Sequence, residues 1–146
     1  MPSTLLNALV KLALCSLALT VGVLGCGEET KVTIEDHANA LTSEPGDSLF
    51  TLTISGEDAS YTFAKISVLV VTPDGDNLSI TCDHDDSNSD KAWDDGESII
   101  CQEPGINIFS ETDVDKDFAV DVHETSESGV LIKFASLVWS VYLTGR

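Results

Sequence analysis

The feature that most constrains the fold of this chain is a series of short apolar runs separated by polar and turn-forming residues. In the run DFAVDVHE, at 117–124, apolar and polar residues alternate with a period of two. That period predicts a β-strand with one buried and one solvated face. Comparable runs are rich in β-branched and aromatic residues, which favour strands. They span 49–54, 60–72, 77–82, 97–101, 105–110 and 130–143.

Three of these runs carry further detail. The run 49–54 places Phe50, Leu52 and Ile54 on one face, whereas 60–72 is apolar on both faces, as in a central strand. The segment TPDGDN that follows predicts a turn, because Pro fixes φ and Gly admits positive φ. The run 130–143 is also apolar on both faces and predicts a buried closing strand. Together the runs predict an all-β fold, an immunoglobulin-like antiparallel β-sandwich of about seven strands.

The charge of the chain is strongly negative. Its formal net charge is −18, and all 25 acidic residues follow position 26, whereas residues 1–25 hold a single charge, Lys11. A surface of this sign repels phosphate backbones and anionic lipid headgroups, so we expect no nucleic-acid partner. Cations and basic proteins are compatible with it.

The segment after Lys11 has 14 residues without a charge. It is too short to span the roughly 30 Å core of a bilayer as a helix and is typical of the apolar region of a signal peptide. It ends in Val23-Leu24-Gly25-Cys26, which resembles the bacterial lipobox. The resemblance implies a diacylglyceryl group on Cys26, cleavage before it and acylation of the new N-terminus. The alternative is an ordinary cleaved signal peptide with a chance cysteine.

This resemblance sets the expected domain organisation: a signal peptide over 1–25, a lipidated cysteine and flexible acidic tether over 26–47, and a β-sandwich over 48–146. The brief alternation at Val32 and Ile34 allows one short strand near the start of the tether. Gly27 is not the aspartate associated with inner-membrane retention, so in a Gram-negative cell the outer membrane is favoured. The expected location is therefore the cell envelope.

The remaining cysteines predict a disulfide. The lipobox resemblance implies that Cys15 leaves with the signal peptide and that Cys26 carries lipid, which leaves Cys82 and Cys101 in a compartment where thiols normally pair. Each ends a short β-type run, so the bond would join neighbouring strands of a ladder or the two sheets. The alternative is metal ligation by both cysteines together with His84.

A second resemblance concerns the folded part. The order of strand, glycine, "VLVV" strand, glycine turn, tryptophan and glycine-acid pair resembles the globular β-domain of archaeal type IV pilins. The matching residues are Gly56, Val68 to Val71, Gly75, Trp93, Gly96 and Glu97. The resemblance implies a β-domain and, as an alternative function, a surface-filament subunit. A pilin keeps a long apolar N-terminal helix, however, whereas this chain has the lipobox.

Two acidic stretches suggest cation binding. The stretch 83–97 holds seven acidic residues and 111–124 holds six. Calcium takes six to eight oxygen ligands, and binding would relieve repulsion within such a cluster. The first stretch is the candidate calcium site, with Asp83, Asp85, Asp86, Asn88, Asp90, Asp94 and Glu97 as ligands. Each stretch also has partial spacing of a twelve-residue calcium loop, at Asp86, Asn88, Asp90, Asp94 and Glu97 and at Asp113, Asp115, Asp117, Asp121 and Glu124.

Signals for catalysis are few. The chain has no G-x-S-x-G elbow and no glycine-rich phosphate loop. We therefore expect a non-enzymatic envelope lipoprotein whose β-sandwich has a binding or structural role, without a cofactor other than calcium. Its expected partners are the membrane, through the lipid anchor, and an envelope protein or a cation. An apolar pocket beside a histidine would instead favour an enzyme.

Overall fold

The structure is a computed structural model and describes residues 29–37, 45–56 and 59–141. The predicted signal peptide and Cys26 lie outside the described residues, as do 38–44 in the predicted tether.

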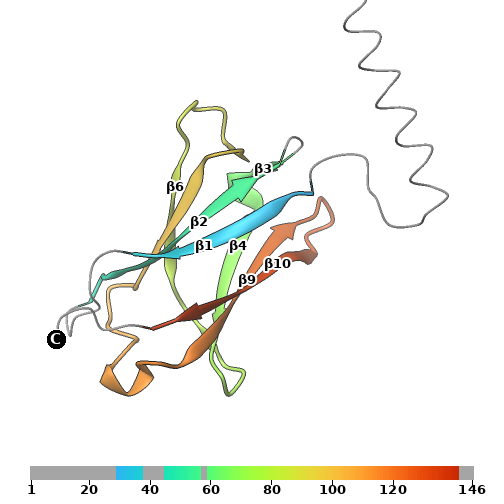
Figure 1. The fold of residues 1–146 in the computed structure, drawn as a ribbon. Coiled ribbons are helices and arrows are strands. Elements are labelled where there is room, and N and C mark those ends of the chain that lie inside the picture. Colours follow the sequence, from blue (N-terminus) through green and yellow to red (C-terminus); the bar gives the residue numbers. More distant parts are fainter. Residues whose placement is uncertain (1–28, 38–44, 57–58, 142–146) are drawn as a thin grey trace, which may run out of the picture.

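Two four-stranded sheets form the fold (Figure 1). The first has the order β1-β2-β8-β6 and the second the order β10-β9-β4-β5, and neighbouring strands are antiparallel throughout. A two-stranded ribbon pairs β3 with β7, and two short 3-10 helices, η1 and η2, lie in the connections. The bounds are β1 Lys31–Asp36, β2 Ser48–Ser55, β3 Ser60–Thr62, η1 Phe63–Lys65, β4 Ile66–Val71, β5 Asn77–Leu78, β6 Thr81–Asp85, β7 Ala92–Asp94, β8 Ser98–Gln102, η2 Glu111–Asp113, β9 Asp117–Thr125 and β10 Leu131–Ser140.

The core lies between the two sheets. Alternate residues of β2 and β9 point into it, and all six are buried, namely Phe50, Leu52, Ile54, Phe118, Val120 and Val122. The Phe50 and Trp139 rings, 5.2 Å apart between centroids, join the two sheets. The period-two pattern thus gave the sheet faces that it predicted, and the all-β antiparallel sandwich is confirmed. The described residues form ten strands rather than about seven.

The chain changes sheets at two places where one continuous strand was predicted. In 60–72 the strand breaks at η1, because Phe63 turns into the core and its N–H donates to the Lys91 carbonyl. In 77–82 the run divides into β5, which pairs with β4, and β6, which pairs with β8. Periodicity reports which face is apolar, but it does not report which neighbour a strand will pair with.

The strand predicted at 105–110 is absent from the structure. The carboxylate of Glu103, 2% exposed, accepts hydrogen bonds from the N–H groups of Ile108 and Phe109 through Oε1. The segment therefore has a side-chain partner instead of a strand partner. Phe109 still enters the core, where its ring packs edge-on against Phe118 and Trp139.

The boundary of the folded domain also differs from the prediction. Residues 31–36, assigned to the flexible tether, form β1 and pair with β2 over the whole register from Lys31↔Ser55 to Asp36↔Phe50. Val32 is buried in the core. The folded part therefore begins by Lys31 rather than at Ser48, because the short alternation at Val32 and Ile34 finds an edge to pair with.

The predicted closing strand is not a buried one. Within the described sheets β10 is an edge strand that pairs with β9 alone. Trp139 is buried, but Val138 on the opposite face is 66% exposed. A run that is apolar on both faces therefore lies at an edge here, with one of its faces open to solvent.

Candidate functional site

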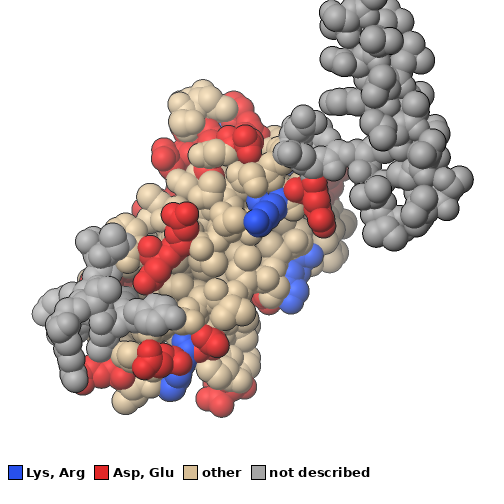
Figure 2. Space-filling model, in the orientation of Figure 1, with Lys and Arg blue, Asp and Glu red and all other residues tan. Residues whose placement is uncertain are grey.

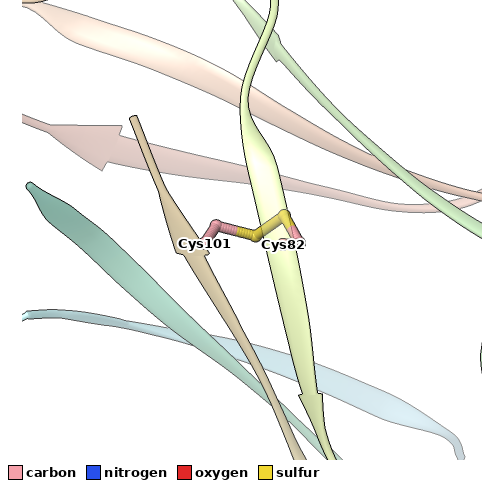
Figure 3. The surroundings of a disulfide bond; sticks show 2 residues. All are labelled: Cys82 and Cys101. Carbon is pink, nitrogen blue, oxygen red and sulfur yellow. A yellow bond between two sulfur atoms is a disulfide. The ribbon is translucent and has the colours of Figure 1, made fainter. Parts of the chain in front are cut away.

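The predicted disulfide is present and lies within one sheet. Cys82 on β6 and Cys101 on β8 are directly paired residues of the ladder, with 4.1 Å between their Cα atoms (Figure 3). Of the two arrangements that the sequence left open, the structure therefore has the bond across neighbouring strands. The bond removes both thiolates from the alternative metal set with His84.

The disulfide closes the chain around the acidic stretch 83–97, which holds the candidate site. Figure 2 shows acidic side chains gathered at the end of the molecule where the β6–β7 connection lies. Glu97 is only 5% exposed, and its carboxylate holds this connection together through hydrogen bonds. Its Oε1 accepts hydrogen bonds from the N–H and the hydroxyl of Ser87, and its Oε2 accepts one from the N–H of Asp94. One buried carboxylate thus links both sides of the connection.

Asp86 and Asp90 complete a three-carboxylate cluster with Glu97. One oxygen from each lies within 4.8 Å of the others. Asp86 accepts hydrogen bonds from the N–H groups of Asp90 and Lys91, and Asp90 Oδ1 accepts one from Ala92. Lys91 has a φ of +68°, so a non-glycine residue supplies the sharp turn at the place where a calcium loop uses glycine. We call Asp86, Asp90 and Glu97 the carboxylate cluster.

The other four predicted ligands do not join this cluster. Asp83 and Asp85 are exposed on β6, where alternation turns them away from the face that carries Cys82 and His84. Asn88 instead accepts a hydrogen bond from the Asp90 N–H. Asp94 lies on β7 with a buried Oδ1 that has no hydrogen-bond partner in the described part of the chain. The cluster offers three anionic oxygens, so a cation there would take its remaining ligands from water or backbone.

The second acidic stretch does not form a calcium loop. Its residues 117–124 lie in β9, so Asp117 and Asp121 project from one face of an extended strand. Asp117 accepts a hydrogen bond from Ser140, and Asp121 accepts one from Ser136 and another from Lys133. Asp113 caps η2 through a reciprocal capping box with Ser110. Each of these carboxylates therefore has a local structural partner.

Two aspartates in this second stretch have pKa values below their usual range. For Asp121 the hydrogen bond from Ser136 is the main cause; it and the Lys133 contact together outweigh partial burial. For Asp113, burial raises the pKa, but the combined hydrogen bonds from Ser110 and the ion pair with Lys116 lower it by more. Both groups therefore favour the ionised form in the folded protein.

A pocket of about 340 Å³ opens between β4 and β6. It is lined mainly by apolar side chains, and it also holds the Cys82 side of the disulfide, Ser67 and His84. The His84 ring packs against Phe63 with 4.5 Å between centroids. A pocket of this kind beside a histidine is the feature that would favour an enzyme, and its lining includes no carboxylate among the residues that the structure describes.

The sequence did not predict the roles of the two buried glutamates, Glu97 and Glu103. Glu97 directly precedes β8 and Glu103 directly follows it, and each holds the connection on its side of the strand through backbone N–H groups. A signal was present, since each glutamate flanks a strand next to a loop. That signal is weak, because most glutamates in such positions are solvated.

Comparison with known proteins finds no matching family model, no similar curated protein and no similar solved structure. Within the described ranges, no helix is long and apolar enough to cross a membrane.

Proposed function

We propose that the chain is a lipid-anchored cell-envelope protein whose β-sandwich has a non-catalytic binding or structural role. The observation that carries this proposal is Val23-Leu24-Gly25-Cys26 at the end of an uncharged 14-residue run. The Cys82–Cys101 disulfide supports it, because such bonds persist in oxidising compartments outside the cytoplasm. With two or three acyl chains on Cys26, membrane attachment would be effectively permanent.

The test is the intact mass of the protein extracted from its native membrane. The expected chain begins at Cys26 and carries added acyl mass. Cys26→Ala should abolish the acyl mass and release the protein from the membrane, whereas Cys15→Ala, the matched control in the same segment, should change neither. A chain that keeps residues 12–25 and has no acyl mass would contradict the proposal and favour the pilin-like alternative.

A second candidate function, calcium binding in the envelope, has one observation in its favour. Three of the seven predicted ligands converge in the carboxylate cluster. Repulsion among three carboxylates within 4.8 Å favours a bound cation. Backbone N–H groups already donate hydrogen bonds to Asp86, Asp90 and Glu97, and these bonds offset part of that repulsion without a cation.

Thermal melting in calcium and in chelator tests this candidate. At a calcium concentration tenfold above the dissociation constant, binding would stabilise the fold by about 1.4 kcal/mol. Asp90→Asn should remove that stabilisation. Asp115→Asn in the second acidic stretch is the matched control, because Asp115 is exposed and its φ of +61° suits asparagine equally well. Coincident melting curves for the unchanged protein would exclude the calcium function.

A further inference from the structure

The first three residues after the β9–β10 turn form an exposed apolar tip. Val130, Leu131 and Ile132 are 58%, 50% and 53% exposed, and they follow a turn that the Ser126 N–H closes on the Val130 carbonyl. Successive strand residues point to opposite faces, so exposure of all three shows that neither sheet covers this end of the hairpin. We call Val130, Leu131 and Ile132 the hairpin tip.

The hairpin tip projects from the end of the sandwich where β1 begins. The indole N–H of Trp139 donates to Asp36 at 3.1 Å, which fixes the last residues of β10 and β1 side by side. The first residues of both strands lie away from this contact, at the same end of the sandwich (Figure 1). β1 begins at Lys31, five residues before Asp36, and β10 begins at Leu131, eight residues before Trp139. The hairpin tip therefore lies at the same end of the sandwich as the start of β1 (Figure 1).

The start of the folded domain at Lys31 places this end close to the proposed anchor. Because β1 begins at Lys31, only five residue steps separate it from Cys26. A fully extended chain of that length spans at most about 17 Å. A domain starting at Ser48 could have stood well away from the bilayer, but one starting at Lys31 is held next to it by the end that carries the hairpin tip.

We propose that the hairpin tip inserts into the boundary between headgroups and acyl chains of the membrane that carries the Cys26 anchor. This inference rests on the proposed lipid anchor. Insertion removes three apolar side chains from water, and a lipid anchor plus a second apolar contact is a stronger attachment than either alone. On β10 the only charged residue is Lys133. The turn before it carries the exposed Glu127, and Glu124 of β9 pairs with Ile132, so insertion of the tip leaves these two carboxylates at the level of the headgroups. The contact is apolar, and it therefore does not require anionic lipid.

The experiment uses the lipidated protein reconstituted in phosphatidylcholine vesicles, with and without brominated acyl chains that quench tryptophan. Leu131→Trp places a reporter at the hairpin tip. Val138→Trp is the matched control, because Val138 is 66% exposed on the same strand and seven residues, about 23 Å, away. The native Trp93 and Trp139 are buried and form a background common to both variants. The intact mass of each sample reports the acyl anchor.

The expected result is that emission from position 131 shifts to shorter wavelength and its added intensity is lost in brominated vesicles, while position 138 shows neither change. Acyl mass without quenching at 131 overturns the insertion and leaves the anchor intact. A chain without acyl mass that does not stay on vesicles overturns the anchor and the insertion together. A blue shift at 131 that depends on protein concentration and not on bromine overturns the insertion in favour of contact with a second copy.

Discussion

The two acidic stretches of this protein have the same partial spacing of candidate calcium ligands and different structures. In 83–97, Asp86, Asp90 and Glu97 converge in a connection between strands, around a buried glutamate. In 111–124, a capped 3-10 turn leads into β9, and its aspartates bond to neighbouring side chains on the sheet. The difference shows that spacing alone does not define a cation site, because strand pairing decides whether side chains converge or spread out.

The largest effect should come from opening the disulfide around the first stretch. A Cys82→Ala, Cys101→Ala double variant should lose about 3 kcal/mol of unfolding free energy, since the bond closes a loop between residues 19 apart. Urea titration measures this loss. Hydrogen exchange should show lost protection in 81–102 ahead of 117–125, and equal loss in both stretches would contradict the local role of the disulfide.

A somewhat smaller effect should come from Glu97→Gln. The amide group of glutamine presents a donor to backbone N–H groups that now meet a carboxylate oxygen, so a buried donor is left without an acceptor, at a cost of about 2 kcal/mol. The matched control is Glu124→Gln at the corresponding position of the second stretch, where a change within about 0.5 kcal/mol is expected. Equal losses in the two variants would remove the distinction between the stretches.

The smallest effect should come from Asp121→Asn in the second stretch. Because the pKa of Asp121 is lowered in the folded protein, its ionised form stabilises the fold above about pH 4, and this contribution is lost as the pH falls through the lowered pKa. The variant should lose only about 0.5 kcal/mol at neutral pH, since Lys133 is half exposed. Its melting temperature should fall less steeply below pH 4 than that of the unchanged protein. A parallel fall in both proteins would show that the Ser136 and Lys133 contacts do not set the acid sensitivity.

Much of the fold was predictable from local pattern. Alternation at 49–54 and 117–124 predicted the core faces of β2 and β9, because the side-chain period of a strand is a property of the backbone itself. The pairing of Cys82 with Cys101 was predicted with the help of the lipobox resemblance, which implied other fates for Cys15 and Cys26 and left these two cysteines. Of the seven candidate calcium ligands, only Asp86, Asp90 and Glu97 converge, since spacing along the chain does not report which way a connection turns.

The sequence by itself determined the all-β class, the buried faces of the main strands and the disulfide pair. The tertiary structure alone decided that 31–36 joins the sheet, that 105–110 bonds to Glu103 instead of a strand, and that β10 stands at an edge with its hairpin tip exposed. The physical reason is the range of the interactions. Periodicity and turn chemistry act over a few residues, whereas strand partners, edges and buried carboxylates depend on contacts between residues far apart in the chain.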